Sequence, residues 1–263
     1  MIKSFELISK VKEKNPLVLH YTNNVTITDC ANVTLSIGAS PLMSFSYEEV
    51  DDIVRICDSV VINIGTMNSE ILDLFILAGK TANKYNKPLV LDPVGVFATK
   101  ARGNLVNKLL NEVKFDVIRG NISEIQFLGG LDVNGKGVDS FDDGSDSTYI
   151  VECVSKKLGC IVVASGKTDI VSDGNVTYKI QNGSKKLKLI TGTGCMSTSL
   201  IGSFLACTNK KIDAATIGTL AMSLSGELAD KENPPIGKYK TLLFDNIFLL
   251  NEEILEKYSK IEV

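Results

Sequence analysis

The sequence of 263 residues contains no tryptophan, one histidine and six cysteines, with no Cys-x-x-Cys pair. This supply is too small and too scattered for a Cys/His zinc site at standard spacing. Cysteines without a paired pattern favour a reducing compartment. No apolar run reaches the roughly 18 residues that a membrane span requires, and the first residues lack the apolar core of a signal peptide. We therefore expect a cytoplasmic protein that does not cross a membrane.

The sequence also has no marked excess of positive or negative charge. The 28 Lys and Arg residues nearly balance the 31 Asp and Glu residues, so electrostatics give no reason to expect nucleic acid or an anionic membrane as a partner. Hydrophobic residues make up 44% of the chain, which permits a sizeable core. Because no linker, low-complexity tract or fixed-period repeat interrupts the sequence, we expect residues 1–263 to form a single domain.

Strand-like and helix-like segments alternate through most of the chain. Short apolar runs predict strands at 17–21, 60–64, 88–92, 116–118 and 160–164, and a hairpin is expected over 168–181. Helix patterns occur at 3–14, 25–37, 48–56, 69–85, 101–112, 148–158, 212–231 and 239–260. Ser46 and Glu49 have the spacing of a capping box for the third of these helices. This order predicts an α/β fold of three layers, α/β/α, around a mostly parallel central sheet.

The segment 190–207 is the strongest candidate for a functional site. Gly192, Thr193 and Gly194 precede an apolar run long enough for three or four helical turns. The free N–H groups of a helix start, together with the helix dipole, suit an anion. Cys195 lies in the first turn, where the pKa of a thiol is expected to fall. The alternative is a tight strand-to-helix turn followed by a buried cysteine.

Two formal nucleotide-binding motifs fail at this point. The dinucleotide fingerprint requires a third glycine or alanine where the chain has Ser197. Gly166-Lys167-Thr168 resembles the end of a Walker A loop, but the first glycine of that loop would be Ile161. The glycine pair is therefore interpreted by its physical properties alone.

Polar residues that follow buried strands are the other site candidates, because ligands of such folds bind beyond the carboxyl ends of the strands. Asp92 can serve a metal or a phosphate-bound Mg²⁺, or it is a turn aspartate that bonds nearby backbone. Arg119 is suited to phosphate or carboxylate. Asn121 and Glu124 match a capping box, which is their simpler interpretation. The remaining candidates at strand ends are Asn23 and Ser165.

Three further features have simpler explanations. Met43 follows Pro41-Leu42 at the end of the turn and extended piece over 38–43. It either lines an apolar pocket or belongs to the core, as is commoner for methionine. His20 lies within a strand, where a hydrogen-bonded core histidine is commoner than a catalyst. The segment 132–143 partly imitates a calcium loop, but Lys136 and Asp143 occupy ligand positions that need other residues, so a calcium site is rejected.

Taken together, several segments resemble the hydroxyethylthiazole kinase family. The matching motifs run in order from about residue 20 to residue 200. They are Thr22-Asn23, Gly38-Ala-Ser-Pro-Leu-Met43, Val60-Val-Ile-Asn-Ile-Gly65, Leu91-Asp-Pro-Val-Gly95, Ile118-Arg-Gly-Asn-x-Ser-Glu124, Gly137-Val-Asp-Ser140 and Thr191-Gly-Thr-Gly-Cys195. The resemblance implies a single-domain ribokinase-like fold that lacks the lid domain of larger relatives. It also implies ATP- and Mg²⁺-dependent phosphorylation of 4-methyl-5-(2-hydroxyethyl)thiazole, a salvage step toward thiamine, by a homotrimer with sites between subunits.

The resemblance also implies roles for individual residues. Met43 and Gly192 would contact the thiazole, with Asn23 nearby. Arg119 and Ser165 would contact ATP. Asp92 and Glu124 would serve the Mg²⁺–phosphate end, which makes the Asn121–Glu124 pair both cap and site. Cys195 stands where the wider ribokinase-like group has an aspartate as general base. Relatives often have alanine in place of Thr193 and threonine in place of Ser165, and both changes keep the groups that the site needs.

These roles lead to a hypothesis for the chemistry, with three rivals. Phosphoryl transfer needs positioning and charge neutralisation more than covalent help. We expect the N–H groups of residues 193–195 to hold the γ-phosphoryl oxygens and Cys195 to take or orient the hydroxyl proton of the substrate. The rivals are a kinase for hydroxymethylpyrimidine or another small alcohol, an ATP-dependent dehydratase or epimerase-coupled repair enzyme of the same fold, and a non-catalytic nucleotide sensor.

Overall fold

A computed structural model describes residues 4–131 and 145–263. Within them, nine strands form one sheet in the order β2-β1-β3-β4-β5-β6-β7-β8-β9. The strands from β2 to β6 are parallel, and β7, β8 and β9 are added in antiparallel register. The strands are β1 (Leu17–Tyr21), β2 (Ser40–Met43), β3 (Ser59–Asn63), β4 (Leu89–Asp92), β5 (Val117–Asn121), β6 (Ile161–Ser165), β7 (Asp169–Ser172), β8 (Thr177–Ile180) and β9 (Ile261–Glu262).

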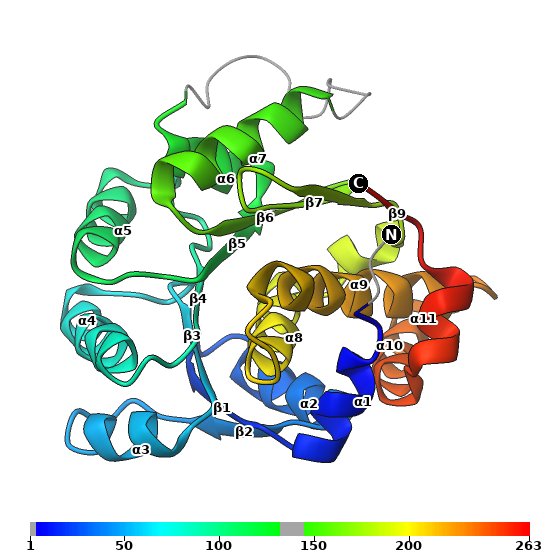
Figure 1. Cartoon of the computed structure of the whole chain (residues 1–263), viewed down its shortest axis with the longest axis horizontal. Coiled ribbons are helices and arrows are strands. Elements are labelled where there is room, and N and C mark those ends of the chain that lie inside the picture. Colours follow the sequence, from blue (N-terminus) through cyan, green and yellow to red (C-terminus); the bar gives the residue numbers. More distant parts are fainter. Residues whose placement is uncertain (1–3, 132–144) are drawn as a thin grey trace.

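Helices cover both faces of this sheet, which gives the three layers visible in Figure 1. The outer face carries α3 (Val50–Ile56), α4 (Ser69–Lys84), α5 (Lys100–Glu112), α6 (Ile122–Gly129) and α7 (Ser145–Leu158). The inner, concave face carries α1 (Leu7–Lys14), α2 (Ile27–Ile37), α8 (Thr193–Leu205), α9 (Lys211–Ala229), α10 (Ile236–Leu249) and α11 (Glu252–Tyr258). The predicted three-layer α/β/α fold with a mostly parallel sheet is therefore confirmed.

The two faces of the sheet have separate cores because successive side chains of a strand point to opposite faces. In β3, Val61 packs with α8 and α9, whereas Val60 and Ile62 pack toward the outer helices. The same alternation puts Val90 and Val117 on the α8 side. A polar residue two positions after any of these valines must therefore face α8.

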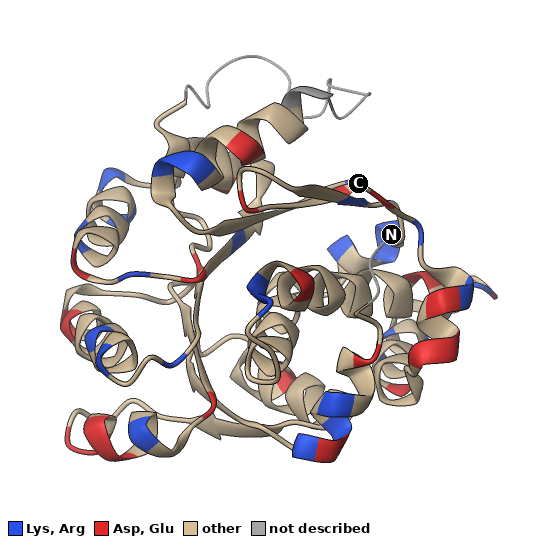
Figure 2. Cartoon of the chain, in the orientation of Figure 1, with Lys and Arg blue, Asp and Glu red and all other residues tan. Residues whose placement is uncertain are grey.

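α8 lies at the centre of the inner layer, and residues 195–205 of this helix are all buried. The helix contains no charged residue, and Figure 2 shows Lys, Arg, Asp and Glu concentrated on the peripheral helices instead. Small side chains such as Ser203, which bonds the Ser199 carbonyl at 2.9 Å, let this helix lie close to its neighbours. Packing on all sides therefore holds α8 in place, and its N-terminus lies at the edge of the sheet.

Most predicted elements agree with the structure within a few residues, but three expectations are wrong. Ser46 does not cap α3, because its hydroxyl donates to Glu48 while Ser44 donates to Glu49. The helix expected over 239–260 is two helices, separated where Asn251 caps α11 by accepting from the Ile254 N–H at 2.9 Å. Arg119 lies within β5 rather than after it. The short 3₁₀ helix η1 (Lys185–Leu189) and β9 were not expected.

The expected loop over 132–143 and the motif at 137–140 lie outside the described residues. Among the described helices, none is long and apolar enough to cross a lipid bilayer.

His20 supplies a prediction about stability, because it is the only histidine of the chain and is fully buried. Its ring lies between the Val18 carbonyl at 3.0 Å and the Ser199 hydroxyl at 3.1 Å, and burial lowers the pKa of His20 to about 4. The unfolded chain takes up the proton near pH 6.5, so the free energy of unfolding should decrease as the pH falls from 6.5 to 4. The change over this window is about 3 kcal/mol.

Urea unfolding at several pH values in wild type and His20→Gln checks this expectation. The variant should lose stability less steeply than wild type between pH 6.5 and 4, whatever its stability at pH 7. Equal slopes would show that His20 does not contribute.

Candidate active site

The residues that close the parallel strands form a row along one edge of the sheet, and all of them except Met43 on β2 are polar. Register pairs Met43 with His20, Asn63 with Asp92, and Asn121 with Ser165. Following the strand order, the row therefore starts with Met43 on β2 and ends with Ser165 on β6. The residues that the family resemblance assigns to the thiazole and to ATP lie at opposite ends of this row, with Asp92 between them.

A chain of hydrogen bonds crosses the middle of the row. Asn63 Nδ2 donates to Asp92 Oδ2 at 2.8 Å, and Asn23 Nδ2 donates to Asn63 Oδ1 at 2.9 Å. Asn23 Nδ2 also approaches Cys195 Sγ at 3.4 Å. The structure thus brings the predicted residues Asn23, Asp92 and Cys195 together through a residue that the sequence analysis did not single out.

Asp92 is buried at the end of β4, with 1% of its surface exposed. Burial, opposed by the charge of Arg119 and assisted by that of Glu124, raises the pKa of Asp92 to about 6. Thr198, on α8, donates to the same Oδ2 atom as Asn63, at 2.9 Å. Both bonds end on Oδ2, and no described residue bonds Oδ1, so Oδ1 can take a ligand from outside the chain.

Glu124 starts α6 and has a structural role as well. Its Oε2 accepts the Asn121 N–H at 2.7 Å, while Asn121 Oδ1 accepts the Glu124 N–H at 2.9 Å, so the predicted capping box is present. Glu124 Oε1 accepts the Gly95 N–H at 2.8 Å, which ties α6 to the loop after β4. Glu124 therefore holds the loop that follows Asp92 in place.

The N-terminus of α8 faces this row. Gly192 precedes the helix with φ +89°, a left-handed conformation that favours glycine, and a Cβ there would meet Thr26 at 2.4 Å. The first N–H group with a recorded helical partner is that of Met196, which donates to the Gly192 carbonyl at 2.8 Å. The amides of residues 193–195 precede it and have no acceptor within the helix. Thr193 Oγ1 donates to the Leu187 carbonyl at 3.0 Å, which anchors the turn to η1.

One expectation about Cys195 is wrong. The helix start was predicted to lower the pKa of its thiol, but burial and the nearby charge of Asp92 raise it. The polar side chains of Thr26, Asn63 and Asn23 act in the opposite direction. Desolvation is the larger effect because Cys195 is only 8% exposed. At neutral pH the group is therefore a thiol.

Arg119 connects α8 with the ATP end of the row. A Cβ added to Gly194 would lie 2.5 Å from Arg119 Nη1, so the guanidinium rests directly on this glycine. Its Nε is buried and has no hydrogen-bond partner among the described residues, which is a reason to expect a ligand nearby. Ser165 Oγ donates to the Gly120 carbonyl at 3.3 Å, a long bond that a ligand can replace.

Sequence reasoning missed Asn63 and Thr198, which hold Asp92, and Asp169, which bonds the turn after β6. Asp169 Oδ1 accepts the Gly166 N–H at 3.0 Å, and Ser223 donates to its Oδ2. The sequence contains a signal for two of these three residues. Asn63 is a polar residue at the end of an apolar strand, and Thr198 lies three residues after Cys195, on the same side of the helix.

The residues at the row suit a metal held mainly by a nucleotide. Oδ1 of Asp92 has no bond from the part of the chain that the structure describes, and carboxylate oxygens are ligands that Mg²⁺ prefers. Within residues 4–131 and 145–263, no group of three or more His, Cys, Asp or Glu side chains could hold a metal by itself. Mg²⁺ that is bound with a nucleotide usually takes one or two carboxylates from the protein, besides phosphates and waters.

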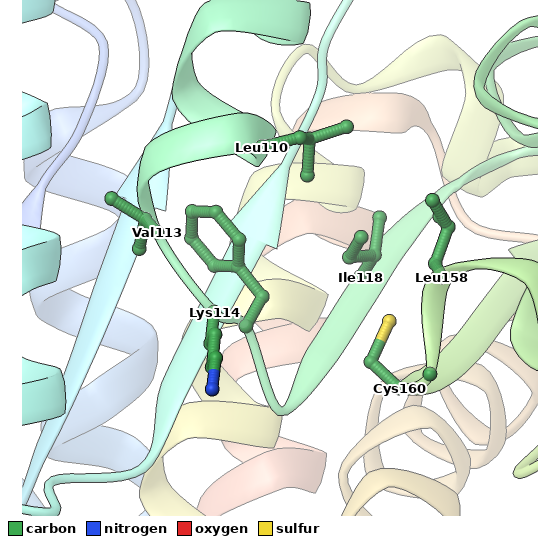
Figure 3. Close-up of a pocket in the computed structure, with 8 residues that line it drawn as sticks. Leu110, Val113, Lys114, Ile118, Leu158 and Cys160 are labelled. Carbon is green, nitrogen blue, oxygen red and sulfur yellow. The ribbon is translucent and has the colours of Figure 1, made fainter.

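A hollow in the structure lies elsewhere, at the amino ends of β5 and β6 (Figure 3). It has a volume of about 390 Å³. Its walls are formed by Leu110, Val113, Lys114, Phe115, Ile118, Leu158, Gly159 and Cys160. Ligands of parallel α/β sheets bind at the carboxyl ends of the strands. We therefore take the row of strand-end residues, and not this hollow, as the candidate active site.

The fold is of the ribokinase-like class. A ribokinase-like superfamily protein from Enterococcus faecalis superposes with a TM-score of 0.63, over 91% of this chain and 88% of that one. Its sequence identity is 15%, so the likeness concerns the fold alone.

The particular family follows from closer matches. The model of the hydroxyethylthiazole kinase family matches residues 8–253, and the chain belongs to this family. It is 64% identical to a hydroxyethylthiazole kinase of Clostridioides difficile over 98% of both chains. The solved structure of a hydroxyethylthiazole kinase from Pyrococcus horikoshii superposes with a TM-score of 0.90 at 33% identity, over 99% of both chains.

Proposed function

We propose that this chain transfers the γ-phosphoryl group of ATP to the hydroxyl of 4-methyl-5-(2-hydroxyethyl)thiazole, a salvage step toward thiamine. The observation that carries the proposal is the buried Asp92, which Asn63 and Thr198 of α8 bond through Oδ2, with no bond to Oδ1 from a described residue. The charge of Arg119, which lies on Gly194 at the start of α8, acts on the same carboxylate. Membership of the hydroxyethylthiazole kinase family supports this substrate. Residues 1–263 would act as one catalytic domain.

The order of residues along the sheet edge suggests how the two substrates lie. Met43, Asn23 and Gly192 would contact the thiazole at the β2–β1 end, and Arg119 and Ser165 would contact ATP at the β5–β6 end. In support of this layout, Arg119 Nε lacks a partner among the described residues. The hydroxyl of one substrate and the γ-phosphate of the other would then meet at the start of α8.

We infer that Mg²⁺ accompanies ATP and that Asp92 and Glu124 serve it, Asp92 through its free oxygen. The bound metal supplies charge neutralisation of the β- and γ-phosphate oxygens. Glu124 uses both oxygens for backbone N–H groups, so its contribution is to place the loop after Asp92 and to add negative charge.

The transfer itself requires positioning and electrostatic stabilisation. The N–H groups of Thr193, Gly194 and Cys195 would hold the γ-phosphoryl oxygens as the bond to the β-phosphate breaks and the bond to the substrate hydroxyl forms. Arg119, on Gly194, adds a cation there. Because the pKa of the Cys195 thiol is raised, the sulfur would keep its own proton at neutral pH. It is therefore better suited to orienting the substrate hydroxyl than to removing the proton of that hydroxyl.

The direct test incubates the purified chain with ATP, MgCl₂ and hydroxyethylthiazole and detects thiazole phosphate by mass spectrometry. Hydroxymethylpyrimidine and other small alcohols serve as parallel acceptors. We expect one phosphorylated thiazole per ADP formed. Preferential phosphorylation of another alcohol, ADP without a phosphorylated product, or ATP binding without turnover would each contradict the proposal.

Substitution of Cys195 gives a graded prediction. Cys195→Ser should lower kcat without abolishing activity, because general-base help contributes only about 10²–10⁴-fold and this thiol is a weak base. Cys195→Asp should retain or raise kcat, since a carboxylate accepts a proton more readily at neutral pH. Steady-state kinetics with hydroxyethylthiazole measure both. Equal kcat values for wild type, Cys195→Ser and Cys195→Ala would show that the sulfur of Cys195 takes no part in the reaction.

We also propose that the chain assembles as a homotrimer with sites between subunits. Large apolar side chains are exposed in the loops after β1 and β2, beside the thiazole end of the row: Val25, Phe45 and Tyr47. A second copy covering them would close this end from water. Light scattering should give three chain masses of 28.5 kDa each, and a monomer with full activity would contradict the proposal. A cytoplasmic location remains a prediction from the sequence.

A further inference from the structure

Two buried amides connect Asp92 with the sulfur of Cys195. Asn63 donates one N–H to Asp92 and accepts one from Asn23, and Asn23 directs an N–H toward Cys195 Sγ at 3.4 Å. Asn63 and Asn23 are 1% and 3% exposed. Buried amides are costly unless their hydrogen bonds are made, so this arrangement is unlikely to change without loss elsewhere in the site.

The backbone fixes the direction of both amides. Asn63 Oδ1 accepts the Gly65 N–H at 2.9 Å, and Asn23 Oδ1 accepts the N–H groups of Val25 at 3.0 Å and Thr26 at 3.1 Å. A backbone N–H can only donate, so each side-chain oxygen must face these groups. The NH₂ group of Asn23 must then point toward Asn63 and Cys195.

Gly65 provides a second, independent constraint on Asn23. A Cβ at Gly65 would lie 3.0 Å from Asn23 Cβ and 3.1 Å from Asn23 Nδ2, so the missing side chain leaves room for the amide. Arg102 in turn holds the loop, because its Nη2 donates to the Gly65 carbonyl at 2.7 Å and its Nη1 to the Val94 carbonyl at 2.9 Å. The segment after β3 is therefore built around the Asn23 side chain.

We propose that Asn63 is a positioning residue for phosphoryl transfer: acting through Asn23, it holds an N–H donor on the Cys195 sulfur and so fixes where that sulfur meets the substrate hydroxyl. Gly65 contributes to the same arrangement, because its missing side chain leaves room for the Asn23 amide. The inference rests on the proposed function, in which Cys195 orients the hydroxyl. It assigns to Asn63 an effect on kcat that is transmitted through Cys195 rather than through the fold.

A double-mutant cycle tests this transmission. Asn63→Leu and Gly65→Ala are each introduced into wild type and into Cys195→Ala, and kcat and KM are measured with ATP and hydroxyethylthiazole. With Cys195 present, each substitution should lower kcat about tenfold, the effect of one hydrogen bond near 1.4 kcal/mol, with little change in the KM for ATP. With Cys195→Ala, Gly65→Ala should lower kcat less than about twofold. Asn63→Leu should lower kcat less in this background than in wild type, and it keeps the part of its loss that comes from the missing bond to Asp92.

Equal losses in both backgrounds would overturn the proposal, since they would show that Asn63 and Gly65 act without Cys195. Ser59→Ala is the matched control. Ser59 is buried on the same strand and donates to the Gly202 carbonyl of α8 at 2.8 Å, so this variant should lose stability while kcat stays unchanged. If Asn63→Leu does not fold, Gly65→Ala carries the test alone, because it leaves the bonds of Asp92 in place.

A crystal structure of Gly65→Ala separates this inference from the proposed function. If wild type fails to phosphorylate hydroxyethylthiazole, the proposed function fails, but the placement of Asn23 can still be examined. The inference predicts that the added Cβ moves Asn23 Nδ2 out of hydrogen-bond range of Cys195 Sγ. An Asn23 side chain that stays in place would overturn it.

Discussion

Asp92→Asn should reduce kcat/KM for phosphoryl transfer by about 10²–10³-fold, the usual cost of removing one electrostatic group from such a site. The amide oxygen of the variant can still accept from Asn63 and Thr198, which now bond Oδ2. What disappears is the negative charge on the oxygen that faces the metal–phosphate end. Steady-state kinetics at saturating MgCl₂ measure the loss.

The stability of this variant gives the matching control. Burial raises the pKa of Asp92 to about 6, which means that the ionised carboxylate costs stability above that pH. Asp92→Asn should therefore have a melting temperature at pH 8 that equals or exceeds that of wild type. A variant that keeps kcat/KM within threefold would show that Asp92 does not act at the reacting phosphate.

Gly194→Ala is expected to have the second largest effect, a loss of about 100-fold in kcat/KM for ATP. The new Cβ would lie 2.5 Å from Arg119 Nη1, so the guanidinium must move away from the start of α8. A displacement of this size at a catalytic group can cost about 100-fold. Both the KM for ATP and kcat should change, because Arg119 and the adjacent amides would be displaced together.

The fold should tolerate Gly194→Ala, since alanine is the best helix former and Gly194 has no positive φ. Gly237→Ala is the control, because a Cβ at Gly237 meets nothing within 4 Å. That variant should retain the activity and the melting temperature of wild type. If Gly194→Ala has normal kinetics, Arg119 and the helix start do not hold the phosphates.

The sequence predicted the layers and the edge of the sheet that carries the site because both depend on local patterns. Continuous apolar strands separated by helices require a parallel sheet covered on both faces. Polar residues after those strands, such as Asp92 and Asn23, were therefore expected at one edge. The capping box of Asn121 and Glu124 was also predicted, since its spacing is a property of a single helical turn.

What could not be predicted depends on burial and on contacts between distant segments. The helix start was expected to lower the pKa of Cys195, but the sequence does not reveal that Cys195 is buried near Asp92, which raises it. Asn63 was treated as part of an apolar strand, although its alternation with Val61 places it on the α8 side. Arg119 on Gly194 is a contact between residues 75 positions apart, which no local pattern encodes.

The central claim is that phosphoryl transfer takes place at the N-terminus of α8. A crystal structure with a non-hydrolysable ATP analogue, Mg²⁺ and hydroxyethylthiazole tests it most directly. We predict the terminal phosphate within hydrogen-bond distance of the N–H groups of Gly194 and Cys195, and the thiazole hydroxyl between that phosphate and the Cys195 sulfur. A terminal phosphate bound away from α8, with these amides closed off by protein, would contradict the account.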